Sequence, residues 1–196
     1  MRRFSAAVSV TAVLIAGCTT PSPSTVPGSS PTRSPETSAP STSARTAPPP
    51  LTGTRSPAIG LPDPTRTPGA TNPAVTPATL TATICARGWT ATVRPPAAYT
   101  NGLKRTQLAS SYSVGSDRNP TDYEEDHLVP LEIGGHPTAE TNLWPEPRAG
   151  IFGAGTKDNL ENVVNHEVCA GRMSLTDAQK LFMTDWIAAA KRLGVL

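Results

Sequence analysis

The chain has 196 residues, of which 22 are proline, 15 glycine and only three cysteine. Seventeen basic residues stand against fifteen acidic ones, and two of the basic residues, Arg2 and Arg3, lie at the extreme N-terminus. Without those two, fifteen positive charges balance fifteen negative ones, so bulk charge gives no argument for a polyanionic partner. Any such attraction has to come from the placement of individual cations.

Residues 1–18 have the composition of an export signal. Two arginines precede a short apolar run, which ends in small residues and Cys18. The run is too short to span a bilayer, so we interpret it as a signal peptide. The sequence Ile15-Ala16-Gly17-Cys18 resembles the lipobox of bacterial lipoproteins, in which the cysteine becomes the lipidated N-terminus. This predicts an extracytoplasmic protein, lipid-anchored to the bacterial membrane, or secreted if the lipobox is not used.

Residues 19–71 are rich in proline, serine, threonine and alanine, with almost no large apolar side chains. Such a composition buries too little surface to offset the entropy of ordering the backbone. We therefore predict a disordered tether over 19–71 and one globular domain over 72–196, which is long enough for a single core.

The first part of this domain carries signals for three elements. Thr76-Pro77 resembles the start of a short helix that ends at Cys85, and the alternation in Gly88–Val93 predicts a strand. Thr100 or Asn101 is a candidate cap for a helix through Leu108. On that helix, Lys104 and Arg105 are expected to be exposed.

The central stretch 122–147 concentrates the reactive side chains. An apolar run from Leu128 to Ile133 predicts a strand, Gly134-Gly135 a turn, and Asn142–Pro145 a return strand. Pro130 has no backbone N–H to donate, so the first strand is predicted to be an edge strand or to contain a bulge.

Two helices are predicted after the central stretch. Leu160, Val163, Val164 and Val168 form one apolar face of a helix from Lys157 to about Val168, with Thr156 as its cap. Ser174 and Asp177 resemble a capping box for the last helix. That helix is interpreted as core packing through Leu175, Ala178, Leu181, Phe182, Trp186 and Leu193.

Two cysteines remain once Cys18 is assigned to lipidation. In an oxidising compartment, Cys85 and Cys169 predict one disulfide that ties the first helical segment to the later one. Neither cysteine lies in a nucleophile motif, and the chain contains no CxxC pair.

Asp126 and His127 are the candidate reactive pair. Hydrolysis of a phosphodiester needs a base to activate water and a cation to take up charge. A neutral histidine suits the first task, and carboxylate oxygens suit a hard divalent ion for the second. Adjacent side chains in a regular strand point to opposite faces. A shared site therefore requires the pair to lie at a strand end or a bulge.

The order of Asp126-His127, apolar strand, Gly-Gly, Asn142 and a helix with acidic residues resembles the HNH endonuclease family, which has the ββα-metal fold. The segments EEDHLVPLEIGG, NLWPEP, KDNLE, VCAGRMSL and AQ...DW resemble a group of small bacterial HNH-like proteins that often carry export signals. The likeness covers most of Cys85 to Trp186. It implies an α+β domain, built from a ββα-metal hairpin-helix centre and additional packing helices.

The resemblance also implies roles for individual residues. His127 matches the general base, Asp126 the first metal ligand, and Asn142 the asparagine that braces the loop holding the histidine. Many family members carry histidine or asparagine about nine residues after that asparagine, where this chain has Ile151. The sequence departs from the family's pattern at that position.

The missing helical ligand then has to come from Lys157 onward. Glu161 is the first choice because it lies at the edge of the apolar face, and Asp158 is the second because it lies in the first turn. Lys157, near the helix N-terminus, is a candidate contact for phosphate. Equally, Glu161 and Lys157 have the spacing of an ordinary exposed i,i+4 pair.

These observations lead to one hypothesis and two rivals. The hypothesis is a metal-dependent endonuclease that uses one divalent ion, Mg²⁺ with Mn²⁺ or Zn²⁺ as alternatives, on nucleic acid, with DNA ahead of RNA and no small organic cofactor. One rival is a non-catalytic surface lipoprotein that binds DNA or a cell-wall polymer on the same scaffold. The other is a purely structural envelope lipoprotein.

Overall fold

The computed structural model of the chain describes residues 60–112 and 116–196. Within these ranges it is an α+β arrangement, in which helices surround one two-stranded antiparallel sheet. The predicted signal peptide, Cys18 and the tether as far as residue 59 lie outside the described residues. In the described ranges, no helix is both long enough and apolar enough to cross a bilayer.

The sheet is the hairpin of β1 (Tyr123–His127) and β2 (Leu143–Pro147). Asp126 lies opposite Trp144 and His127 opposite Leu143. The strand predicted over Leu128–Ile133 is therefore wrong, because that run forms a connection that contains a short 3₁₀ turn, Leu131–Ile133. The sequence hid β1 because acidic residues are poor strand formers, and here tertiary contacts override that preference.

Gly134 and Gly135 close this 3₁₀ turn; they do not form the tip of a tight hairpin. Gly134 has a φ of +77°, a left-handed conformation that favours glycine. A Cβ on Gly135 would lie 1.7 Å from the carbonyl oxygen of Val129, so no larger residue fits there. The pair of glycines allows the connection to fold tightly back on itself.

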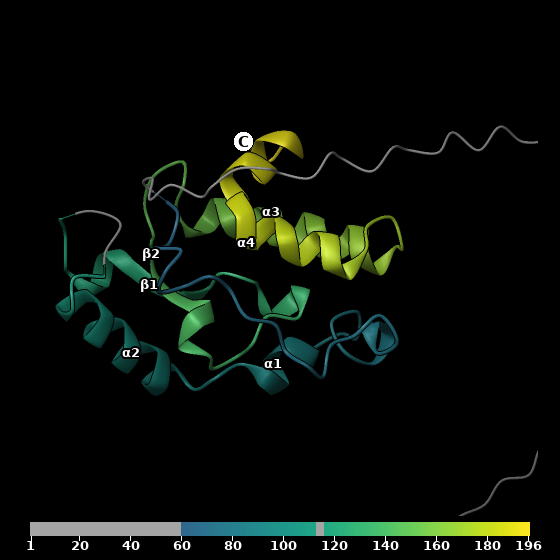
Figure 1. Cartoon of the computed structure of the whole chain (residues 1–196), viewed down its shortest axis with the longest axis horizontal. Coiled ribbons are helices and arrows are strands. Elements are labelled where there is room, and N and C mark those ends of the chain that lie inside the picture. The colour runs from purple at the N-terminus through teal and green to yellow at the C-terminus, as the bar shows by residue number, and fades with distance from the viewer. Residues whose placement is uncertain (1–59, 113–115) are drawn as a thin grey trace, which may run out of the picture. The chain divides into compact units, whose positions relative to one another are not determined.

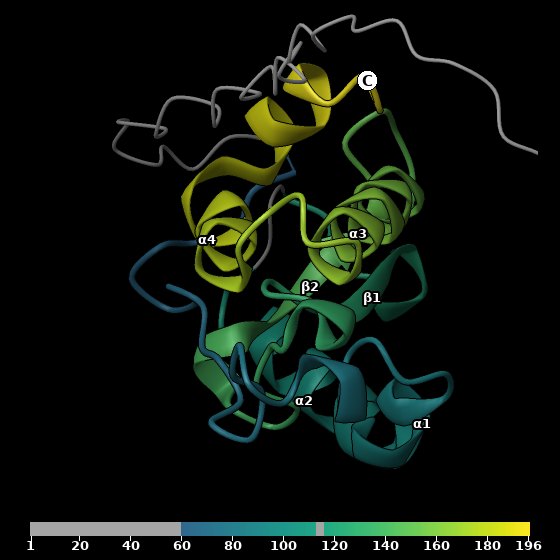
Figure 2. The same cartoon turned by 90° about the vertical axis from the view of Figure 1, so that its right-hand side faces the viewer.

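The hairpin lies between two helical layers (Figures 1 and 2). On one side are α3 (Ala154–Cys169) and α4 (Leu175–Arg192), which pack against each other. On the other side is α2 (Ala97–Ala109), which contacts both strands. The short helix α1 (Trp89–Val93) precedes α2 on the same side.

Two predictions in the first part of the domain differ from the structure. The segment Gly88–Val93 contains α1 and not a strand, and Gly88, in a left-handed conformation, is the residue that precedes the helix. The predicted helix from Thr76 is reduced to a 3₁₀ turn, Leu80–Ala82. There the hydroxyl of Thr79 bonds the carbonyl oxygen of Ala74, a local bond that competes with helix.

The two later helices agree more closely with prediction. Helix α3 begins at Ala154, three residues before the expected start, and Val163 is exposed although it was assigned to the packed face. In α4, the Ser174 hydroxyl accepts a hydrogen bond from Asp177 N, as the capping box predicts. The main core lies between the hairpin and these helices and includes Leu128, Trp144, Leu160, Val164, Phe182 and Trp186, all buried.

Packing extends further toward the N-terminus than the predicted boundary at Asn72. Leu61 is buried, and the carbonyl oxygen of Gly60 accepts a hydrogen bond from the indole of Trp186. Thr71 forms a β-bridge with Gly135. Residues 60–71 therefore belong to the folded unit. Their composition did not indicate this, because much of the segment is held by backbone hydrogen bonds, which do not depend on the type of side chain.

The disulfide between Cys85 and Cys169 is present, as the cysteine count predicts. It joins the segment before α1 to the last residue of α3. The Asn165 side chain adds a hydrogen bond to the carbonyl oxygen of Ile84. Together these contacts attach the α1 segment to α3.

Candidate functional site

The hairpin presents two sets of side chains, because successive residues of a strand point to opposite faces. Asp126 faces α3, where it contacts Lys157. Cross-strand pairing puts Trp144 and Glu146 on that same face. Glu125 belongs to the other face, which α2 covers, and His127 is the last residue of β1, where the charges of Asp126 and Lys157 act on its pKa.

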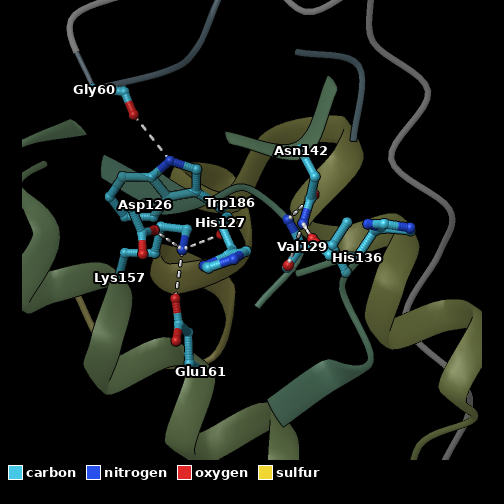
Figure 3. Close-up of polar contacts among 9 residues, drawn as sticks. All are labelled: Gly60, Asp126, His127, Val129, His136, Asn142, Lys157, Glu161 and Trp186. Atoms are coloured by element: carbon cyan, nitrogen blue, oxygen red, sulfur yellow. Dashed lines mark hydrogen bonds and ion pairs between the residues drawn. The ribbon is translucent and has the colours of Figure 1, made fainter. Parts of the chain in front are cut away.

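Lys157 lies at the centre of the α3 face (Figure 3). Its side chain is 0% exposed. The ammonium donates to Asp126 Oδ2 at 2.5 Å, to the carbonyl oxygen of His127 at 2.9 Å and to Glu161 Oε1. All three of its protons are used within the protein, and the aromatic ring of Phe182 covers it at 5.7 Å.

The carboxyl groups around Lys157 differ in protonation. Burial alone would raise the pKa of Asp126, but the Lys157 charge and the neighbouring Glu146 outweigh it, so the pKa is below its ordinary value. Burial raises the pKa of Glu161 to about 8 despite Lys157. Burial likewise raises the pKa of Glu146 well above the ordinary value.

The ammonium charge itself is secure. Burial opposes it, but the carboxylates of Asp126, Glu161 and Glu146 outweigh burial and raise the pKa of Lys157 well above its ordinary range. Asp126 is therefore the ionised acid of the cluster and Lys157 its permanent counter-ion.

This geometry changes the roles predicted for the helix residues. Lys157 was a candidate contact for phosphate, but its amine is buried and fully hydrogen-bonded, so it holds the carboxylates instead. Glu161 forms the expected i,i+4 pair with Lys157, yet the pair is buried, with 0% and 15% side-chain exposure. Asp158 lies one residue along the helix and is exposed, and its charge interacts with that of Asp126.

Asn142 is fully buried and holds the connection between the two strands. Its side chain accepts a hydrogen bond from Val129 N and donates to the carbonyl oxygens of Val129 and His136 (Figure 3). It also accepts a hydrogen bond from Ala70 N. The first three contacts join the start of the connection, at Val129, to its later part, at His136. They restrain the backbone that follows His127, and none of them involves Asp126.

His127 ends β1 and is 4% exposed. Its Nε2 lies 2.9 Å from the carbonyl oxygen of Pro137. A carbonyl can only accept a hydrogen bond, so Nε2 carries the proton and Nδ1 of the neutral ring carries the free lone pair. No residue in the described ranges hydrogen-bonds Nδ1.

Burial lowers the pKa of His127, and the positive charges of Lys157 and Arg94 act in the same direction. The charge of Asp126 opposes them only in part. The ring is therefore neutral at physiological pH, which is the state that a general base needs.

The carboxylate oxygens of this cluster are donors that suit a hard divalent ion. The described residues contain no group of three histidine, cysteine or acidic side chains that could hold a metal ion. Mg²⁺ is commonly held by one or two carboxylates and completes its shell with water and substrate oxygens. Asp126 and Glu161, with side chains 14% and 15% exposed, are the residues that would hold it. Asp158 is the exposed carboxylate nearest to them on α3.

Sequence analysis missed Glu146. It is fully buried, and neither of its carboxylate oxygens has a hydrogen-bond partner in the described structure. The only available signal was its position two residues after Trp144, which places both on one face of β2. Without the register of the hairpin, that face could not be matched to the face of Asp126.

Searches against models of protein families, against curated proteins and against solved structures found no match to this chain.

Proposed function

We propose that this chain is an exported, lipid-anchored hydrolase of nucleic-acid phosphodiester bonds, with a ββα-metal centre and His127 as general base. The observation that carries the proposal is the tautomer of His127. The contact to Pro137 leaves Nδ1 as the free base at the end of β1, next to an ionised acid. A neutral ring with one nitrogen fixed and the other free is what proton abstraction from water requires.

The acid beside it has the complementary role. Asp126, with Glu161, holds one divalent ion, and Lys157 fixes the orientation of both carboxylates through its hydrogen bonds. When bound, such an ion neutralises charge on the phosphate and on the leaving oxygen. Asn142 contributes by positioning, since it holds the connection that follows His127.

The test is plasmid cleavage by the purified chain in Mg²⁺ or Mn²⁺. We expect nicking that stops with chelator and falls about 10²–10⁴-fold in His127→Ala, the range for loss of a general base. His166→Ala is the matched control, because that ring is 76% exposed and lies away from the site. Equal nicking by the two variants would contradict the assignment of His127.

The pH profile gives a second check. Because the pKa of His127 is below its ordinary value, the rate should rise with pH and reach its plateau earlier than for an ordinary histidine. A rate that still climbs above neutrality would assign the base to another group.

The rival proposal is a binding module that keeps this scaffold without turnover. Two observations favour it: His127 is only 4% exposed, and Lys157 already forms ion pairs with Asp126 and Glu161. Retention of DNA without nicking, unaffected by chelator, would support the rival.

A further inference from the structure

Arg94 is an exposed cation at a fixed point beside the candidate site. It caps the C-terminus of α1, where its backbone N–H bonds the carbonyl oxygen of Thr90. Pro95 and Pro96 follow it directly, and a residue before proline is restricted to extended backbone, here with φ −60° and ψ 127°. The base of the side chain therefore has little freedom, although the guanidinium lies at the surface.

Arg94 is close enough to lower the pKa of three groups on three different elements, although burial is the largest influence on each. These groups are His127 at the end of β1, Glu132 in the hairpin connection and Asp158 in the first part of α3. The packing of α1 against the turn that contains Glu132 is consistent with this position. The guanidinium is thus near the point where β1, the connection and α3 meet.

The guanidinium is also unused. Four other arginines of the described structure are engaged: Arg66 with Ser110, Arg118 with the Leu108 carbonyl, Arg148 with Glu124, and Arg172 with Glu167. Arg87 and Arg105 are also available, but of these three arginines only Arg94 acts on the pKa of His127. No hydrogen bond or ion pair between the Arg94 side chain and a described residue is present. Its donors remain available to a ligand.

An anionic substrate needs a cation at this place. A phosphate that approaches His127 also approaches the carboxylates of Asp126 and Asp158, which repel it. Lys157 cannot reach it, because its side chain is buried and its protons are all donated within the protein. A guanidinium, by contrast, matches two phosphate oxygens with two parallel hydrogen bonds.

We propose that Arg94 binds the phosphate of the nucleic-acid backbone and holds it beside His127. This assignment rests on the proposed function for its substrate class. It replaces Lys157 as the phosphate contact that the sequence suggested. The Cys85–Cys169 disulfide attaches the segment that carries Arg94 to α3. It therefore helps to keep Arg94 in place beside the candidate site.

The experiment measures binding separately from cleavage. A fluorescein-labelled thymidine dodecamer is titrated into the purified chain in chelator, so that no metal-dependent cleavage occurs. We expect Arg94→Ala to weaken binding about 10-fold or more and Arg94→Lys to recover part of it, because a lysine keeps the charge but not the paired hydrogen bonds. Arg87→Ala is the matched control: Arg87 is likewise exposed and lies on the other side of α1 in sequence.

The ring signals of the histidines locate the bound oligonucleotide. The chain has three histidines, so the His127 signal can be assigned by its absence in His127→Asn. We expect the oligonucleotide to shift this signal in the wild type and in Arg87→Ala, and to leave it unshifted in Arg94→Ala at the same concentration. Circular dichroism verifies that each variant is folded.

The outcomes separate this inference from the proposed function. If Arg94→Ala and Arg87→Ala bind and shift as the wild type does, the phosphate site is overturned while cleavage by the wild type can still stand. If the wild type never cleaves but binds through Arg94 with the His127 shift, the phosphate site stands and the hydrolase proposal fails. Absence of wild-type binding overturns the phosphate site.

Discussion

The two faces of the β1–β2 hairpin each bury a lysine, and the two lysines have different partners. On the α3 face, Lys157 directs its ammonium at two carboxylates, Asp126 and Glu161. On the α2 face, Lys104 is also buried, although the sequence predicted it to be exposed. Its amine donates to the carbonyl oxygen of Tyr123 at 2.9 Å, and no described residue hydrogen-bonds either carboxylate oxygen of Glu125.

The comparison shows that burial raises the pKa of an acid on either face and is outweighed only at Asp126. Contact with Lys157, together with the hydrogen bond from Glu146, lowers the pKa of Asp126 in spite of burial, whereas Glu161, which contacts the same ammonium, has a pKa of about 8. Burial without such a contact raises the pKa of Glu125 to about 8, and the nearby charge of Asp126 adds to the effect. One hairpin therefore carries an ionised acid on the face of the candidate site and a protonated acid on the opposite face.

The largest expected effect comes from removal of the cation on the α3 face. Lys157→Met leaves the ionised Asp126 buried without a counter-ion, and loss of one partner of a buried ion pair costs about 3–5 kcal/mol. We expect this loss in the free energy of unfolding measured by urea denaturation near pH 7. Lys180→Met is the control, because Lys180 is exposed on α4.

A second substitution tests the cause of that loss. Asp126→Asn in the Lys157→Met background removes the unpaired charge of Asp126 and should restore part of the stability. A loss below about 1 kcal/mol in Lys157→Met itself would show that the carboxylates do not depend on the ammonium.

The α2 face should respond in the opposite direction. Folded Glu125 has a pKa of about 8 against an ordinary 4.5, so the folded chain holds its proton more tightly than the unfolded chain. Its contribution to stability is full below pH 4.5 and is lost as the pH rises through 8. Glu125→Gln, which has no charge, should therefore stabilise the fold by about 1–2 kcal/mol above that range and change it little near pH 5.

Thermal unfolding at the two pH values measures this difference. The new amide also has an available acceptor, because the side-chain oxygen of Gln107 lacks a donor. Glu140→Gln is the control on an exposed acid. Equal stability of wild type and Glu125→Gln above pH 8 would show that Glu125 is ionised at little cost.

The smallest effect is expected for Lys104→Met. The hydrogen bond to the Tyr123 carbonyl is lost, but Arg148 Nε also donates to that oxygen at 3.2 Å, so the acceptor keeps a partner. We expect a loss of about 0.5–1 kcal/mol, the size of one ordinary hydrogen bond. Urea unfolding beside Arg105→Met, a change at the exposed neighbour, checks it; a loss as large as that of Lys157→Met would remove the distinction between the faces.

The sequence by itself determined the elements whose signals are local. The capping box at Ser174, the apolar face of α4 and the pairing of two cysteines needed only spacing and composition. The Asp126-His127 pair and Asn142 were also identifiable as candidate site residues from their motif. Such patterns predict the structure correctly because a helix cap depends on interactions within a few residues. With only two cysteines left after Cys18, a single disulfide pairing was possible.

Tertiary structure decided the rest. The strand was predicted at Leu128–Ile133, one segment after the real β1, and Lys104 was predicted to be exposed. Both predictions followed from the rule that acids and lysines lie in solvent unless they have a buried partner. Which carboxylates meet Lys157, which one is left unpaired, and where Arg94 lies all depend on the register of a hairpin with a fifteen-residue connection, residues 128–142. A shift of one residue in that register would exchange the two faces, and nothing in the spacing of the charged residues specifies it.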